Sequence, residues 1–185
     1  MGTEGSTVLE PLWQGLPMLD AASVSGSASC ALPPRYEAVK SARDFTRRTL
    51  QRWEITEEFD DVALVVSELV TNAMRHGLTP GADHGAASGD EGDPPVRLHL
   101  MRWSARLVCA VRDPSSKPPD TTAVTAAPAA EDDGTADFAE LAGFAAESGR
   151  GLCLVDSFSD NWGWHPLSGP LAGKIVWALF RLRPV

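Results

Sequence analysis

The chain of 185 residues has the length of one domain with a substantial core, and its formal net charge is −9. This acidic balance argues against a nucleic-acid phosphate backbone as the direct partner, because proteins that bind one usually carry a basic excess. The three cysteines are widely spaced, so the sequence predicts no disulfide framework and no zinc site. No apolar run approaches the about 18 residues of a membrane span, and no Lys or Arg precedes Arg35, so neither a membrane segment nor a signal peptide is expected. These features together predict a cytoplasmic protein.

The N-terminal part of the chain divides into a leader and a first helix. Residues 1–31 are rich in Ser, Gly and Ala without a sustained period, so we expect a disordered leader, with the domain formed by residues 32–185. A helix is predicted from Pro33 to Trp53, and one side of it is basic, with Lys40, Arg43, Arg47, Arg48 and Arg52. This basic side is either a solvated polar face or a docking surface for an acidic partner.

A second helix is predicted from Phe59 to His76, with Gly77 as its stop. Its apolar residues follow the i, i+3, i+4, i+7 spacing of an amphipathic helix. Glu68 and Asn72 lie one turn apart at the edge of the apolar stripe. The carboxylate can reach a reacting hydroxyl, and the amide oxygen can bind a hard cation such as Mg²⁺. An ordinary core helix with two polar surface residues gives the same pattern.

The rest of the chain alternates long loops with strands. Residues 79–95 are predicted as a loop insertion and residues 114–148 as a long acidic lid. Between them, residues 96–101 and 107–111 alternate in hydropathy and predict an antiparallel hairpin. A short helix and two strands are predicted to follow, at Gly151–Ser159, Asn161–His165 and Lys174–Leu182. Helices before and between antiparallel strands indicate an α+β fold, a two-layer α/β sandwich.

Two further motifs lie where a nucleotide site needs them. Asp113 ends a predicted strand, where a carboxylate can accept a hydrogen bond from an exocyclic amine and so select adenine; an ordinary Asp-Pro turn is the alternative. The run Gly149–Leu152 opens the short helix, where glycines allow close approach to phosphates and free N–H groups attract anions. Ser148 as a helix cap is the structural alternative there. The sequence contains no P-loop, nucleophile elbow or HExxH motif.

Four segments in this order resemble the ATP-binding kinase domain of bacterial anti-sigma regulatory proteins: VVSELVTNAMRHG, VRDPS, ESGRGLCLVDSFSDNWG and GKIVWALF. That group belongs to the histidine kinase-like (Bergerat-fold) ATPase superfamily, which also includes histidine kinases and gyrase. The similarity runs from about Leu32 to Leu182. It implies a mixed, mostly antiparallel sheet covered on one face by helices, with ATP and Mg²⁺ as cofactors.

The resemblance also implies roles for individual residues. Glu68 corresponds to the general base, Asn72 to the Mg²⁺ ligand and Arg75 to a basic residue that approaches phosphate. Asp113 would hold the adenine amine, with Ser115 beside it in the nucleotide site.

The remaining implied residues belong to the phosphate side of the site, where Gly149, Arg150, Gly151 and Leu152 would form the hinge of the lid. The implied activity is phosphorylation of a serine or threonine on an anti-anti-sigma protein, coupled to binding and silencing of a sigma factor. The resemblance is also compatible with a homodimer formed through the first helix.

Three departures from the family pattern motivate an alternative interpretation. Relatives often have Asp-x-Gly where this chain has Asp113-Pro114-Ser115, and a Thr where it has Ile175, which would remove a hydroxyl that reaches the base through water. The lid is also acidic. The alternative is therefore a catalytically weak or inactive nucleotide-binding module that acts by sequestering a protein partner. A third reading is a detached sensor-kinase domain with His76 as the nearest acceptor, although we expect His76 to pack locally.

Overall fold

The computed structural model describes residues 24–33, 37–78, 96–121, 124 and 151–183. The helices are α2 (Ala38–Arg52), α3 (Phe59–Asn72), the π-helical turn η2 (Ala73–Gly77), a helix over residues 151–158 and the 3₁₀ turn η3 (Gly169–Leu171). The strands are β1 (Gly26–Leu32), β2 (Val96–Trp103), β3 (Arg106–Asp113), β4 (Asn161–Leu167) and β5 (Gly173–Arg181). The predicted loop 79–95 lies outside the described residues, as does nearly all of the predicted lid beyond residue 121.

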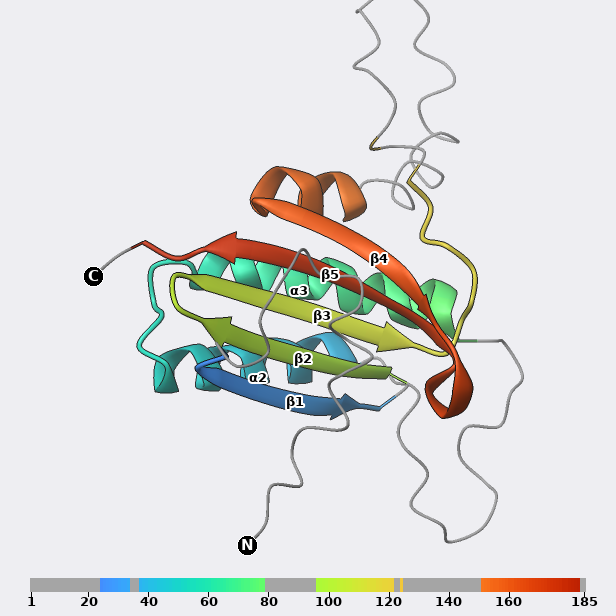
Figure 1. Cartoon of the computed structure of the whole chain (residues 1–185), viewed down its shortest axis with the longest axis horizontal. Coiled ribbons are helices and arrows are strands. Elements are labelled where there is room, and N and C mark those ends of the chain that lie inside the picture. Colours follow the sequence, from blue (N-terminus) through green and yellow to red (C-terminus); the bar gives the residue numbers. More distant parts are fainter. Residues whose placement is uncertain (1–23, 34–36, 79–95, 122–123, 125–150, 184–185) are drawn as a thin grey trace, which may run out of the picture.

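The five strands form one sheet in the order β1-β2-β3-β5-β4, and each neighbouring pair is antiparallel. Helices α2 and α3 lie side by side across one face of this sheet (Figure 1). The predicted α+β two-layer sandwich is therefore confirmed, as are the β2–β3 hairpin and the two strands after the lid.

Strand β1 corrects the predicted boundary of the leader. Residues 26–31 were expected to be disordered, yet they pair with β2 in a continuous register from Gly26 opposite Arg102 to Leu32 opposite Val96. The side chains of β1 alternate between exposed and partly buried positions, as expected of an edge strand. Its sequence is mostly Ser, Ala and Gly, which have little intrinsic strand preference, so the pairing with β2 decides its structure.

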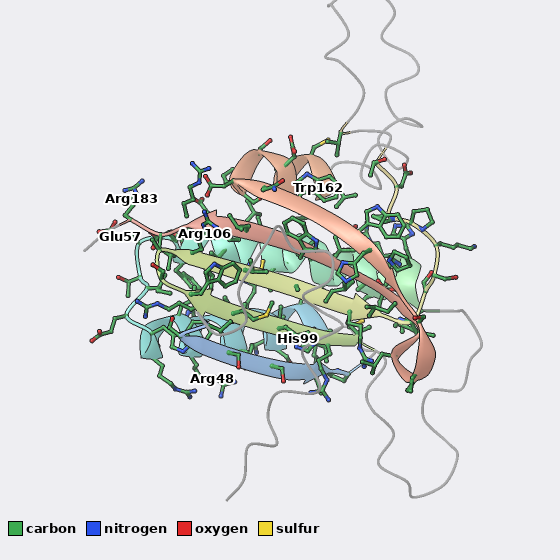
Figure 2. All side chains as sticks on the ribbon, in the orientation of Figure 1. Arg48, Glu57, His99, Arg106, Trp162 and Arg183 are labelled. Carbon is green, nitrogen blue, oxygen red and sulfur yellow. The ribbon has the colours of Figure 1, made fainter. Side chains whose placement is uncertain are left out.

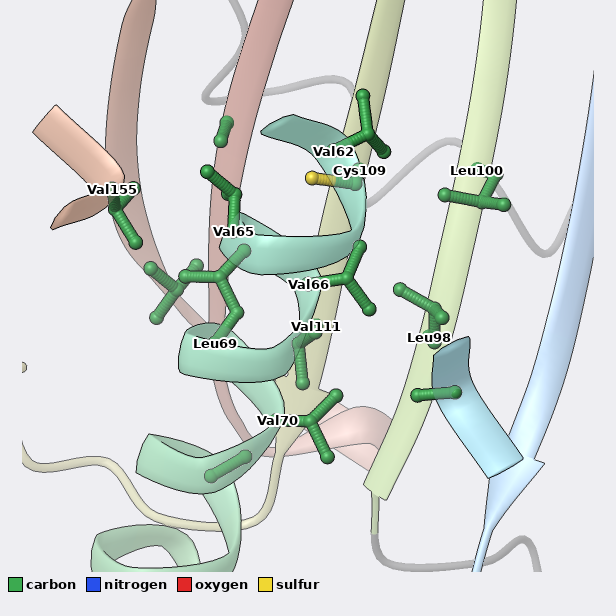
Figure 3. Close-up of a cluster of buried hydrophobic side chains, with 14 of the residues drawn as sticks. Val62, Val65, Val66, Leu69, Val70, Leu98, Leu100, Cys109, Val111 and Val155 are labelled. Carbon is green, nitrogen blue, oxygen red and sulfur yellow. The ribbon is translucent and has the colours of Figure 1, made fainter. Parts of the chain in front are cut away.

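The core lies between α3 and the sheet. Val62, Val65, Val66, Leu69 and Val70 of α3 are at most 2 % exposed and point toward β2, β3 and β5 (Figure 3). They meet the side chains of alternate strand residues, among them Leu98, Leu100, Cys109 and Val111. Burial raises the pKa of the Cys109 thiol to about 12, so this cysteine stays neutral and packs as a small apolar residue. The predicted apolar stripe of the second helix is thus the core-facing stripe.

The opposite face of the sheet carries a second apolar cluster, formed by Met101, Trp103, Val108, Ala110, Ile175, Trp177 and Leu179. These residues alternate along β2, β3 and β5 with those that face the helices, because successive side chains of a strand point to opposite faces. The central strands are therefore apolar on both faces, which explains their high hydropathy.

The helix over residues 151–158 covers β4 and closes the helix layer at that edge. Trp162 on β4 donates its Nε1–H to Asp156 Oδ1 at 2.9 Å and so ties the strand to the helix (Figure 2). Val155 of this helix is fully buried in the same core as α3. Gly151, the first described residue of this helix, lies beside the C-terminal half of α3. In the described part of the chain, no helix is long and apolar enough to cross a membrane.

Candidate functional site

A cavity of about 590 Å³ opens where the end of α3, the turn η2, the end of β3 and the start of β5 meet. This volume lies in the range of small-molecule sites, which runs from about 300 to 1,000 Å³. Its walls include the apolar side chains of Leu69, Val111, Leu152 and Val176. Polar and charged groups converge on the same space from Asn72, Arg75, His76, Asp113, Ser115, Lys117, Asp120 and Lys174. A cavity that combines apolar walls with convergent polar groups is typical of a ligand site.

Gly151, in the helix over residues 151–158, lies in close contact with Glu68 and Asn72. A Cβ added at Gly151 would lie 2.8 Å from Glu68 Oε2 and 3.4 Å from both amide atoms of Asn72. Such a distance to Oε2 is too short for a real side chain, so glycine allows this approach. The structure therefore joins residues of two predicted motifs that are far apart in the sequence. Asn72 lines the cavity, whereas Glu68 lies one helical turn earlier and is not among the lining residues.

The half-buried carboxyl group of Glu68 has a perturbed proton affinity. Burial raises its pKa above the ordinary value, and the nearby positive charge of Arg75 lowers it in part. A carboxylate that holds its proton more tightly than usual is a stronger base. A carboxylate with such a shift beside a cavity is a candidate proton acceptor.

The π-helical turn η2 shapes one wall of the cavity. At Ala73 the α-helix gives way to five residues in π geometry, which often marks a functional site. The predicted helix to His76 is thus correct in extent, but its last turn is wider than an α-helical one. Arg75 and His76 are exposed and line the cavity, so the expectation that His76 packs locally is wrong. Gly77 ends the turn against Asp113, where an added Cβ would lie 2.6 Å from the Asp113 Cγ.

Asp113 and Lys174 form a buried ion pair in the cavity wall. They are opposite each other in the β3–β5 register, and Lys174 Nζ donates to Asp113 Oδ1 at 2.9 Å. Burial raises the pKa of Asp113, while the hydrogen bond and charge of Lys174, the Ser115 N–H and the charge of His76 lower it in part. Ser115 N donates to the same Oδ1 at 2.9 Å, and the Ser115 hydroxyl accepts from Lys117 N at 3.3 Å.

The structure places most of the predicted site residues together. Asn72, Arg75, Asp113, Ser115 and Leu152 all line the cavity, and Gly151 lies against both Glu68 and Asn72. The other two predicted hinge residues, Gly149 and Arg150, lie outside the described residues.

Lys174 and Lys117 were not identified as site residues from the sequence. Lys174 stood in a quoted motif, but its meeting with Asp113 depends on the register between β3 and β5, which no local pattern gives. Lys117 belongs to the first residues of the predicted lid, where Pro114–Asp120 line the cavity.

The expectation about Ile175 is wrong. Ile175 is 1 % exposed and belongs to the cluster on the far face of the sheet, whereas its neighbours Lys174 and Val176 line the cavity. A hydroxyl at this position would point away from the cavity because strand side chains alternate. The absence of Thr at residue 175 therefore removes nothing from the site.

A comparison with models of protein families matches residues 32–178 to the histidine kinase-like ATPase domain. The matched stretch extends from the last residue of β1 into β5 and contains every residue that lines the cavity. A search among curated proteins found no match.

Proposed function

The chain belongs to the histidine kinase-like ATPase domain family, and from this premise we propose that it is an ATP-dependent protein serine/threonine kinase that acts as an anti-sigma regulator. The observation that carries the proposal is the contact of Gly151 with Glu68 and Asn72 beside the cavity. It brings a basic carboxylate, a neutral amide oxygen and a glycine that allows close approach of a phosphate to one place. These are the groups that phosphoryl transfer from a nucleotide needs.

The lining residues suit an adenine nucleotide. Asp113 provides an acceptor for the amine of the base, and Leu69, Val111 and Val176 provide apolar surface for its ring. Arg75 and Lys117 bring positive charge to the cavity although the whole chain has a net charge of −9. Cationic side chains in the cavity favour a polyphosphate over the uncharged ligands that the same volume could hold.

Mg²⁺ fits the donor set beside Gly151. In the described part of the chain, no group of three His, Cys, Asp or Glu could hold a metal ion. Mg²⁺ in nucleotide sites is instead held by one or two protein oxygens together with the phosphates, and Asn72 Oδ1, beside Gly151, would supply one of them. When bound with ATP, it would neutralise charge on the phosphate oxygens.

The protein's own groups then account for the transfer step. Glu68 accepts the proton of the incoming serine or threonine hydroxyl, whose oxygen forms the bond to the γ-phosphorus while the bond to ADP breaks. Its raised pKa favours this role, because the carboxylate keeps the proton it receives. Arg75 stabilises the negative charge that develops on the phosphoryl oxygens.

The proposed partners are a sigma factor and an anti-anti-sigma protein, the second being the phosphorylation substrate. Helix α2 supports a protein-binding role, since Lys40, Arg43, Arg47, Arg48 and Arg52 are all exposed on it. Such a basic surface would attract an acidic protein surface. A homodimer is compatible with the same helix and would compete with a partner for it.

The test combines nucleotide binding with phosphate transfer. Purified protein is titrated with ATP and Mg²⁺ in a calorimeter, and partners captured with and without ATP are incubated with γ-labelled ATP. Glu68→Gln should bind ATP as the wild type does and lose at least about 100-fold in transfer rate, the usual effect of removing a general base. Ser67→Ala is the matched control, because the Ser67 hydroxyl donates to Ala63 O of its own helix at 2.6 Å.

Each outcome separates the candidate functions. Transfer to a serine or threonine that depends on Glu68 supports the kinase. ATP binding without transfer to any captured partner supports the sequestering module instead. An acid-labile phosphoprotein indicates phosphohistidine and would contradict the serine/threonine assignment. No heat on titration with ATP would contradict both the kinase and the nucleotide-binding module.

A further inference from the structure

The ion pair between Asp113 and Lys174 is buried in the wall of the cavity. The two side chains are 2 % and 5 % exposed, and they face the helices from adjacent strands. Lys174 Nζ also lies 3.4 Å from Ser115 O, so the ammonium group is held between two oxygens. A buried lysine with two such contacts has a fixed position.

The hydrogen bonds of Asp113 are unequally divided between its two carboxylate oxygens. Within the described part of the chain, both Lys174 Nζ and Ser115 N donate to Oδ1. Gly77 packs on the same side, since a Cβ added there would lie 2.8 Å from Oδ1. Oδ2 thus keeps its acceptor capacity, and Asp113 lines the cavity. A carboxylate fixed through one oxygen presents the other in one orientation.

We propose that Lys174 is a positioning residue that gives the site its preference for a 6-amino purine, by holding the Asp113 carboxylate ionised through Oδ1 and leaving Oδ2 to accept the amine. This inference rests on the proposed function and adds to it the residue that controls base recognition. Lys174 does not touch the base in this arrangement; it acts through Asp113.

The ionisation of Asp113 depends on its charged neighbours. Lys174 on β5 faces the carboxylate directly, and His76 of η2 acts on it through its charge. The other charged residues that line the same cavity are Arg75, Lys117 and Asp120. Burial alone favours the neutral acid, which can donate a proton and no longer requires an amine as its partner. Removing the ammonium group should therefore weaken recognition of the amine even if the cavity keeps its shape.

The experiment compares ATP with purine riboside 5′-triphosphate, which lacks the amine. The dissociation constants of both nucleotides are measured by calorimetry between pH 5 and 8.5 for the wild type, Lys174→Met and Lys174→Arg. The ratio of the two constants cancels the titration of the phosphates, which is common to both nucleotides. It also cancels changes that weaken the binding of both nucleotides equally.

The wild type should prefer ATP about tenfold or more at neutral pH, as expected for a hydrogen bond to a charged group. In Lys174→Met the preference should fall to about twofold, and the pH at which it disappears should move upward, because the cation no longer lowers the pKa of Asp113. Lys174→Arg should restore most of the preference. A merely structural lysine would change both affinities together and leave the ratio and its pH dependence unchanged.

Thermal unfolding without nucleotide shows whether each variant is folded, and Lys174→Gln replaces Lys174→Met if the latter is not. A folded neutral variant that keeps the wild-type ratio and pH profile would overturn the role of Lys174 and leave the proposed function intact. A wild type that binds both nucleotides equally would also overturn it. A wild type that binds neither nucleotide would remove the proposed function together with this inference.

Discussion

Lys174 and Ile175 are neighbours on β5 but project to opposite faces of the sheet. Lys174 pairs with Asp113 in the cavity wall, whereas Ile175 is buried in the apolar cluster on the far face. The two positions therefore have different consequences for function, although one short motif contains both. The residue at position 175 therefore contributes to the stability of the sheet, and the residue at position 174 contributes to the site.

Ile175→Thr should leave nucleotide affinity within about twofold of the wild type, because the new hydroxyl cannot reach the cavity. It should lower the free energy of unfolding by about 2 kcal/mol through lost apolar contact and a buried hydroxyl. Calorimetry and urea unfolding measure the two effects. Val176→Thr is the matched variant on the cavity side, and it should weaken ATP binding about fivefold. If Ile175→Thr changed the affinity more than Val176→Thr, the assignment of the two faces would be wrong.

Gly151→Ala should place a methyl group 2.8 Å from Glu68 Oε2 and so displace Glu68 or the helix. We expect phosphate transfer to fall at least about tenfold, since small shifts of a positioned catalytic group have effects of this size. The variant should remain folded, because alanine favours a helix more than glycine does. The control is Ser157→Ala, which removes only an exposed hydroxyl bonded to Cys153 O in the same helix. Wild-type transfer by Gly151→Ala would show that the close contact is not needed.

Glu68→Gln should be more stable than the wild type at neutral pH. The pKa of Glu68 is raised in the folded state above its ordinary 4.5, so the folded protein loses stability as the pH rises through the folded-state pKa. Glutamine does not ionise and avoids this loss. After allowance for solvent screening at a half-buried site, we expect a Tm about 1–2 °C higher at pH 7–8 and no difference below pH 4.

The matched control is Glu57→Gln, at the far end of α3 from the cavity. Glu57 is exposed and lies 3.7 Å from Arg183, a surface pair that contributes little (Figure 2). The difference in Tm between Glu57→Gln and the wild type should be almost the same at every pH. A Glu68→Gln variant that is less stable than the wild type at neutral pH would contradict the direction of the pKa shift.

Gly173→Ala and Gly169→Ala compare two glycines with positive φ. Gly173 has φ 144°, and an added Cβ would contact Asp113 O and lie 2.8 Å from Pro114 Cα; Gly169 has φ 72° and no atom within 4 Å. We expect Gly169→Ala to lower the free energy of unfolding by about 1 kcal/mol, from its backbone conformation alone. Gly173→Ala should lower it by about 3 kcal/mol or more. Urea unfolding measures both. If both variants lost the same free energy of unfolding, the backbone of Gly173 would not be closely packed against the end of β3.

The sequence was sufficient for the elements whose signals are local. The apolar spacing of α3 predicted both the helix and its core-facing side, and alternation predicted the β2–β3 hairpin. The edge strand β1 was missed, because its small residues carry no periodic signal and its structure comes from pairing with β2. The π turn η2 was missed for a similar reason, since its residues continue a helical pattern.

By itself, the sequence determined the chemical groups that the site contains: the carboxylate and amide on one helix, the aspartate at a strand end and the glycine before a second helix. Only the tertiary structure decided which of them meet. The register of β3 against β5 pairs Lys174 with Asp113, and the packing of helix 151–158 brings Gly151 against Glu68 and Asn72. These meetings depend on contacts between residues far apart in the chain, and local preferences of single segments do not encode such contacts.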